Sequence, residues 1–228
     1  RNLGMAGLTS QELVLISAST LYNRVQGRGS IPFVILDARS AAEFESVHLI
    51  GAVNVDVEKI EADSEGQGLN MRCVEKNFSS SVALSKFRNR AEARIIIVSA
   101  SPEDDYSSRD SAGPPSTGRR LGNWLLTQGS MVECGVLEEG FGFFCGRYMF
   151  MCVGPFSEEA LGDRGPGASA TGAYYPSEII PGFLYLGDQR NAEREYQLKD
   201  LGLTAVMNCA AEMKNSFPES FEYHKVEL

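Results

Sequence analysis

The stretch ILDARSAAEFESVHLIGAVNV, residues 35–55, decides the fold of the first half of the chain. It continues the apolar segment IPFVILDA and then reaches the polar residues Asp37 and Arg39. The segment AAEFESV favours one or two helical turns, and IGAVNVD is typical of a second short strand, entered at Gly51. Short apolar strands that alternate with helices predict a parallel sheet with both faces covered.

The segments on either side continue this alternation. Residues 11–25 have mostly helical spacing, with Ser17 or Ser19 as a cap, whereas residues 57–94 are polar and weakly helical. RIIIVSA is a strong candidate for a parallel strand, the helix TGRRLGNWLLTQG ends at Gly129, and MVECGVL is the next strand. The aromatic segment FGFFCGRYMFM closes the core. The first half is therefore predicted to be an α/β domain.

Residues 154–173 have the composition of a flexible linker, because glycine and proline are frequent and large apolar residues are scarce. Beyond them, IIPGFLYLGD predicts a strand with a Pro-Gly turn, AEREYQLKDLG a helix ending at Gly202, and LTAVMNCA and YHKVEL two further strands. We expect a domain at residues 10–153, a linker at 154–173 and an incomplete domain at 174–228. The last should not fold stably alone, since a sheet edge and an apolar face would remain uncovered.

Composition excludes several classes of function. The formal charge of −9 argues against a nucleic-acid binder, and no apolar run approaches the length of a membrane span. The five cysteines are widely spaced and only two histidines are present, so that no metal site, disulfide framework or cofactor site is predicted. A reducing setting, cytoplasmic or nuclear, fits this usage best.

The first half resembles a rhodanese-like domain. LDAR, EF, His48, IGA and VNV follow one another as in the first signature of these domains, and VLEEGFGFFCGRYMF resembles the strand and turn with which they finish. Asp37 and Arg39 can anchor loops at a strand end, and Gly51 admits a tight turn. For Asp37, Arg39, His48 and Gly51 we therefore favour a structural role over a catalytic one.

Rhodanese-like sulfurtransferases carry a cysteine in the loop after the fourth strand, where backbone N–H groups stabilise the thiolate. The matching loop here, SASPEDDYSSRDSAGPPST, contains no cysteine and is long and acidic. Cys134, Cys145 and Cys152 lie on or beside the apolar closing strands and are interpreted as buried small hydrophobes. The resemblance therefore implies a non-catalytic domain, and a free-standing sulfurtransferase is the least favoured hypothesis.

Residues 174–228 resemble the opening of a dual-specificity phosphatase domain, through IIPGFLYLG, LKDLGLTAVMN and FEYHKVEL. A rhodanese-like domain followed by such a domain is the arrangement of the MAP kinase phosphatases. That family uses a cysteine preceded by histidine and followed six places later by an arginine. No cysteine of this chain has either neighbour, so no catalytic residue is assigned and this segment should be inactive. The resemblance implies a protein phosphatase, or alternatively a pseudophosphatase scaffold that binds kinases or phosphoproteins.

In MAP kinase phosphatases the rhodanese-like domain docks a kinase through basic residues beside apolar ones. The segment SKFRNRAEAR is nearest in position to that motif, and a solvated helix face is the alternative reading. A MAP kinase or another phosphoprotein is the implied partner. The candidate docking residues are Lys86, Phe87, Arg88, Arg90 and Arg94.

Overall fold

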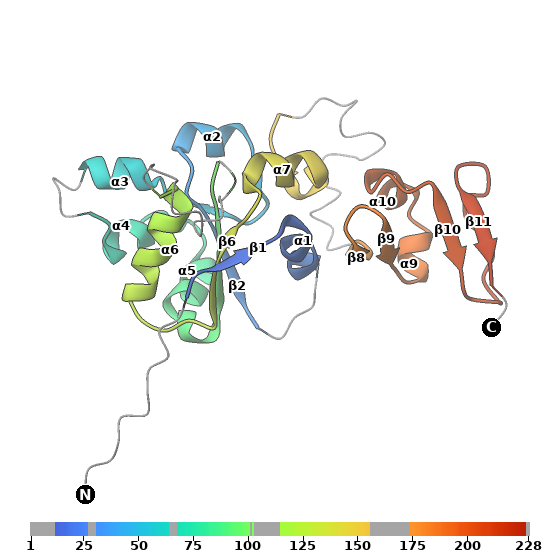
Figure 1. Cartoon of the computed structure of the whole chain (residues 1–228), viewed down its shortest axis with the longest axis horizontal. Helices are drawn as coiled ribbons and strands as arrows, with labels where there is room; N and C mark the ends of the chain where they lie inside the picture. Colours follow the sequence, from blue (N-terminus) through green and yellow to red (C-terminus); the bar gives the residue numbers. More distant parts are fainter. Residues whose placement is uncertain are drawn as a thin grey trace, which may run out of the picture.

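The computed structural model describes residues 12–26, 31–63, 68–100, 102, 115–155 and 174–226. A five-stranded sheet, with helices on both sides, organises residues 12–155, which we call the first body (Figure 1). Every neighbouring pair in this sheet is parallel. Its strands, in spatial order, are β1 (Val14–Ile16), β6 (Glu133–Leu137), β5 (Arg94–Val98), β2 (Phe33–Asp37) and β4 (Val53–Asn54). The expected α/β fold, a parallel sheet flanked by helices, is confirmed.

Both faces of the sheet are buried, as the nearly continuous apolar runs in its central strands predict. On β5, Ile96 faces a cluster that includes Leu21 of α1, while Ile95 faces a second cluster that includes Leu121 of α6. The antiparallel pair β3 (His48–Leu49) and β7 (Cys152–Val153) closes one end of the body. The helices are α1 (Ala18–Gln26), α2 (Ala41–Ser46), α3 (Val57–Asp63), α4 (Met71–Glu75), α5 (Ser81–Arg88), α6 (Thr117–Thr127) and α7 (Gly140–Arg147), with 3-10 turns η1 (Arg90–Glu92) and η2 (Met149–Met151).

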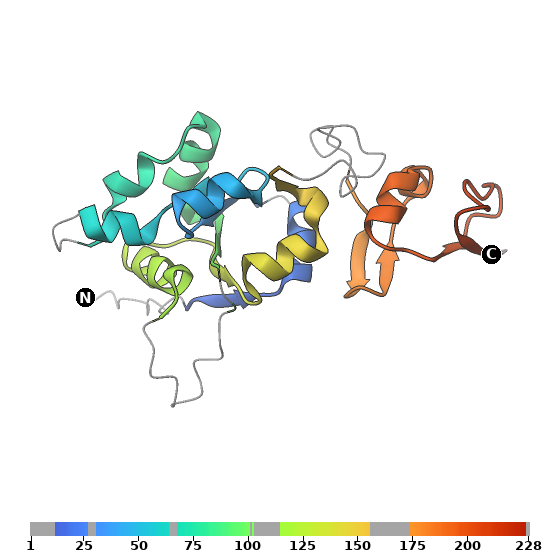
Figure 2. The ribbon, with the colours of Figure 1, turned by 90° about the horizontal axis from the view of Figure 1, so that it is seen from above.

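Residues 174–226, which we call the second segment, form smaller units of their own. The hairpin β8 (Ser177–Ile180) and β9 (Leu184–Leu186) is followed by α9 (Gln189–Ala192), α10 (Glu195–Asp200) and the parallel pair β10 (Ala205–Asn208) and β11 (Glu222–Lys225). Strand β8 lies beside α1 of the first body in both views (Figures 1 and 2). Residues 156–173, most of the expected linker, lie outside the described residues, and the domain boundaries stay a prediction.

The amino-terminal prediction is partly wrong, because residues 14–16 form a strand rather than the start of a helix. Strand β1 pairs in parallel with β6, with Val14 opposite Gly135. Helix α1 begins only at Ala18, and the Ser17 hydroxyl accepts a hydrogen bond from the Thr20 N–H at 3.2 Å. A strand of three residues gains its stability from its partner, which lies far away in the sequence.

Two further segments differ from expectation. Residues 140–147, expected within a strand and turn, form helix α7, because Phe141 and Phe144 then lie on one helical face and pack into the core. The helix expected at residues 192–202 is interrupted, since Arg194 has an extended backbone between α9 and α10. The expected end at Gly202 is confirmed by its positive φ of 64°.

Replacing Gly135 with alanine should destabilise the first body by about 1–3 kcal/mol. A Cβ at this position on β6 would lie 2.0 Å from Cδ1 of Ile16, which is buried on β1. Urea unfolding measures the loss. Gly142→Ala is the matched control, because nothing lies within 4 Å of its Cβ and alanine favours the helix by roughly 0.5–1 kcal/mol. Equal effects of the two substitutions would contradict the tight contact of β1 with β6.

Candidate functional site

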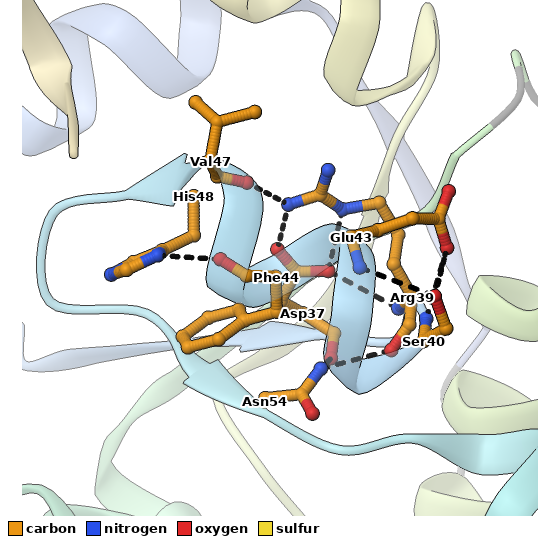
Figure 3. A network of polar contacts seen from close by, with 8 residues as sticks. All are labelled: Asp37, Arg39, Ser40, Glu43, Phe44, Val47, His48 and Asn54. Carbon is orange, nitrogen blue, oxygen red and sulfur yellow. Dashed lines mark hydrogen bonds and ion pairs between the residues drawn. The ribbon is translucent and has the colours of Figure 1, made fainter. Parts of the chain in front are cut away.

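Asp37 and Arg39 of the expected signature lie at the carboxyl end of β2, and His48 follows helix α2 nearby (Figure 3). Asp37 is fully buried, and Arg39 is 6% exposed. Both carboxylate oxygens of Asp37 accept from the Arg39 side chain, one from Nε at 2.9 Å and one from Nη2 at 2.6 Å. The Arg39 backbone N–H donates to the same carboxylate at 3.1 Å. The two side chains thus form a bidentate, desolvated ion pair.

This ion pair joins several elements of the first body. Nη2 of Arg39 also donates to the Val47 carbonyl at 2.7 Å, at the end of α2, and the guanidinium lies 3.6 Å from the ring centre of Phe141 on α7. The Asn54 amide donates to the carbonyls of Asp37 at 3.2 Å and of Arg39 at 2.9 Å. Because Asn54 lies on β4, these bonds connect β4 to the segment that carries the ion pair. These contacts are those of an anchor that fixes loops, and they leave the ion pair little surface on which to bind a ligand.

The segment between Arg39 and Gly51 is ordered by local contacts. Ser40 and Glu43 form a capping box at the start of α2. The His48 ring stacks on Phe44 at 4.0 Å, and its Nδ1–H donates to the Phe44 carbonyl at 2.8 Å (Figure 3). Gly51 has a φ of 77°, which a residue with a side chain adopts only with strain. The geometry supports a structural role for the four signature residues.

The two ends of the loop after β5 are held by hydrogen bonds. The Ser99 carbonyl accepts from the Phe141 N–H at 2.8 Å, and the Ser116 side chain accepts from the Arg119 N–H at 3.0 Å at the start of α6. Residues 101 and 103–114 lie outside the described residues. The sequence between Ser99 and Ser116 contains no cysteine, so no sulfur nucleophile is available in this loop.

Three cysteines of the first body, Cys134, Cys145 and Cys152, occupy different environments. Burial and then the nearby Glu133 carboxylate raise the pKa of Cys134, on β6, to about 12. Cys152 on β7 is buried, and its hydrogen bond to Cys145 together with burial raises its pKa. That hydrogen bond, aided by the Arg39 charge against the opposing effect of burial, lowers the pKa of Cys145 to about 7.

Cys145 departs from expectation, since it lies on helix α7 and is only half-buried. Sequence reasoning treated it separately from Cys152. Cys152 lies on β7, beyond the end of helix α7, so the helical period of that segment gives no signal that the two thiols meet. Among the described residues, no group of three His, Cys, Asp or Glu side chains could hold a metal ion.

Phe87 of the candidate docking segment is fully buried. Its ring packs against Phe78 with centroids 4.9 Å apart, in the cluster that α5 and α6 form over one face of the sheet. It therefore belongs to the core and is not an apolar contact that a partner could reach.

The other four residues, Lys86, Arg88, Arg90 and Arg94, form what we call the basic cluster. Lys86 and Arg88 are exposed, whereas Arg90 and Arg94 are half-buried. Arg88 pairs with Glu75 at 2.7 Å, and Nη2 of Arg90 donates to the Gln128 carbonyl at 2.8 Å. Lys86 and the exposed part of Arg88 are therefore the charges most accessible to an acidic partner.

None of the helices in the described part of the chain is long and apolar enough to span a membrane. The same part contains no cysteine with the phosphate-binding arginine six places on that the resemblance requires. The described residues therefore provide a structural anchor, the Asp37–Arg39 pair, and the exposed part of the basic cluster.

Comparison with known proteins identifies relatives of this chain, although no protein-family model matches it. The chain is 36% identical over 93 residues to a probable rhodanese domain-containing dual specificity protein phosphatase of Dictyostelium discoideum, a match that covers 41% of this chain and 19% of that protein. It is 46% identical over 50 residues to protein-tyrosine-phosphatase IBR5 of Arabidopsis thaliana, covering 22% of this chain and 20% of the relative.

A third relative matches almost the whole chain. Dual specificity protein phosphatase 1 of Homo sapiens is 23% identical over 214 residues, which covers 88% of this chain and 56% of the relative. The chain thus spans about half the length of this relative and about a fifth of the other two. The resemblance inferred from the sequence is confirmed: two of these relatives are dual specificity protein phosphatases, one of them named for its rhodanese domain, and the third is a protein-tyrosine-phosphatase.

Proposed function

We propose that this chain is part of a dual-specificity protein phosphatase of the MAP kinase phosphatase type. The first body is its regulatory, non-catalytic domain, and the second segment opens its phosphatase domain. The observation that supports this assignment is the match to human dual specificity protein phosphatase 1, which extends over 88% of the chain and therefore over both parts. The whole protein would hydrolyse phosphotyrosine and phosphothreonine in proteins through a cysteinyl-phosphate intermediate.

The chain alone lacks the residues for this reaction. A phosphatase nucleophile of this kind needs a low pKa and an arginine that binds the phosphate. Cys145 has a lowered pKa, but Met151 stands six places beyond it and can bind no phosphate. The corresponding residues for Cys73, Cys134, Cys152 and Cys209 are Ser79, Gly140, Glu158 and Asn215.

The basic cluster presents positive charge with which the first body can bind an acidic protein partner. Lys86 and Arg88 are exposed on α5, and complementary charge speeds association and fixes orientation. We propose that an acidic surface of a MAP kinase, or of another phosphoprotein, docks here. Because Phe87 is buried, this docking would rest on charge and would weaken as the ionic strength rises.

Hydrolysis of para-nitrophenyl phosphate tests the proposed activity. We expect hydrolysis by the whole protein and no rate above the uncatalysed background for the 228-residue chain, because the nucleophile and its arginine are absent from this chain. Circular dichroism of both proteins establishes that they are folded.

Each alternative gives a different result. If the folded whole protein is also inactive, the chain belongs to a pseudophosphatase scaffold, and kinase binding becomes the property to measure. Thiocyanate release from thiosulfate and cyanide by the 228-residue chain would contradict the non-catalytic assignment of the first body.

A further inference from the structure

The side chain of Glu178 on β8 is completely buried, although it is a carboxylate. Three residues of the first body bind it: Nη2 of Arg147 lies 2.7 Å from one oxygen, the Tyr148 hydroxyl lies 2.6 Å from the other, and the Ser19 side chain also hydrogen-bonds the carboxylate. Within the second segment, the Gly182 N–H at 2.7 Å and the Tyr185 hydroxyl at 2.8 Å complete its shell. A buried charge is tolerated only when hydrogen-bond donors surround it. Because these donors come from the first body and from the second segment, the burial of Glu178 depends on both parts of the chain.

The backbone of the same strand is held from helix α1. The Asn23 side chain donates to the Glu178 carbonyl at 2.7 Å and accepts from the Glu178 N–H at 2.8 Å. The Tyr22 hydroxyl donates to the Pro176 carbonyl at 2.6 Å. The Asn23 amide thus bonds both the N–H and the carbonyl of one residue. Such a pair of hydrogen bonds recognises an extended strand independently of the side chains of that strand, and it fixes the register of the strand.

A third contact holds Tyr175, which lies two residues before β8. Tyr175 is 6% exposed, and its ring stacks on Phe150 with centroids 4.2 Å apart and an interplanar angle of 19°. Its N–H donates to the Gln26 side chain at 3.0 Å. The first body thus contacts the tetrapeptide Tyr175–Glu178 at three places: the Tyr175 ring, the backbone and the Glu178 carboxylate.

The hairpin turn adds a close approach that only glycine permits. Gly182 has a φ of 69°, and a Cβ there would lie 2.6 Å from Nη2 of Arg147. The turn therefore packs against the guanidinium that binds Glu178; the Glu178 side chain is fully buried, whereas 29% of the Arg147 side chain stays exposed. Sequence spacing could not reveal this arrangement, because Asn23 and Glu178 are 155 residues apart.

These contacts have the form of peptide recognition, in which backbone hydrogen bonds supply affinity and a few side-chain positions supply specificity. We propose that α1, α7 and η2 of the first body form a receptor face for an extended acidic peptide, and that Tyr175–Glu178 of this chain occupies it in cis. The recognised pattern is an aromatic residue, proline, any residue and glutamate. This inference does not rest on the proposed phosphatase activity.

Hydrogen exchange on the 228-residue chain tests the cis contact. We expect Arg147→Met and Asn23→Leu, both changes in the first body, to speed exchange at least tenfold across residues 177–186 of the hairpin. Exchange across β5 should stay slow, which shows that the first body remains folded. Arg88→Met is the matched control, because Arg88 pairs with Glu75 at 2.7 Å and makes no contact with the hairpin. Unchanged exchange in the hairpin, with β5 still protected, would overturn the proposal.

A synthetic peptide tests whether the face is a receptor. Fluorescently labelled peptide 174–180 should bind the Glu178→Gln chain at least tenfold more tightly than the wild-type chain, whose own segment competes at high effective concentration. The same peptide with glutamine at position 178 should bind neither chain tightly. If the Glu178→Gln chain releases its hairpin in hydrogen exchange and still fails to bind the wild-type peptide, the receptor assignment is wrong.

Discussion

Replacing Asp37 with asparagine should lower the free energy of unfolding by about 3–5 kcal/mol. The substitution keeps the shape of the side chain but removes the charge that neutralises Arg39. The guanidinium then remains in a site where it is 6% exposed, fixed by the Val47 carbonyl and the Phe141 ring, and cannot reach water. Urea unfolding followed by circular dichroism measures the loss.

The exposed pair of Arg88 and Glu75 provides the control. Its N–O distance of 2.7 Å is similar to that of the buried pair, but 58% of the Arg88 side chain is exposed. Glu75→Gln should therefore change the free energy of unfolding very little, because water and salt screen this interaction. Similar effects of Asp37→Asn and Glu75→Gln would show that burial does not govern the strength of the Asp37–Arg39 pair.

A double variant separates the cost of an unpaired charge from the value of the pair. Asp37→Leu with Arg39→Met removes both charges together, and such replacement of a buried pair is often close to neutral. Here the Asn54 amide bonds only the backbone carbonyls of the two residues, so those bonds can persist. The double variant should therefore be more stable than Asp37→Asn, although it loses the hydrogen bond to the Val47 carbonyl.

The sequence predicted the parts of the fold that depend on local pattern. The run Ile95–Val98 is apolar on both faces, which only a doubly covered sheet accommodates, and it forms the central strand β5. Helix α6 ends at Thr127, just before Gly129, whose positive φ of 125° is a conformation that glycine adopts readily. Both signals lie within a few residues of the structure that they predict.

The missed features depend on partners that are distant in the sequence. Strand β1 has three residues and pairs with β6, so its own composition could not distinguish it from a helix. The docking prediction counted Phe87 as a surface residue because charged residues surround it, but its place in the core is set by contacts with other helices and the sheet. The contacts of Glu178 with Tyr148 and Asn23 of the first body join residues 30 and 155 positions apart, beyond the reach of any local pattern.

Acid should release the hairpin through protonation of Glu178. Burial alone would raise the pKa of this carboxyl group, but hydrogen bonds from Ser19, Tyr148, Arg147 and the Gly182 N–H outweigh burial and lower its pKa from 4.5 to about 2. A pKa that is lower in the folded state means that the ionised group stabilises the fold above pH 4.5 and that this contribution is lost as the pH falls toward 2. The shift corresponds to on the order of 3 kcal/mol.

The difference in unfolding free energy between the wild-type chain and Glu178→Gln isolates this one group from the other carboxylates. It should be largest above pH 4.5 and should shrink toward zero near pH 2, because a protonated glutamate and a glutamine both present a neutral carbonyl acceptor to the Arg147 guanidinium. Urea unfolding at pH 7, 4 and 3 measures it, and Glu193→Gln, an exposed change in the same segment, should follow the wild type throughout. A difference that stays constant with pH would mean that Glu178 holds the hairpin by shape rather than by charge, and the receptor face would then select for the size of the fourth residue and not for its carboxylate.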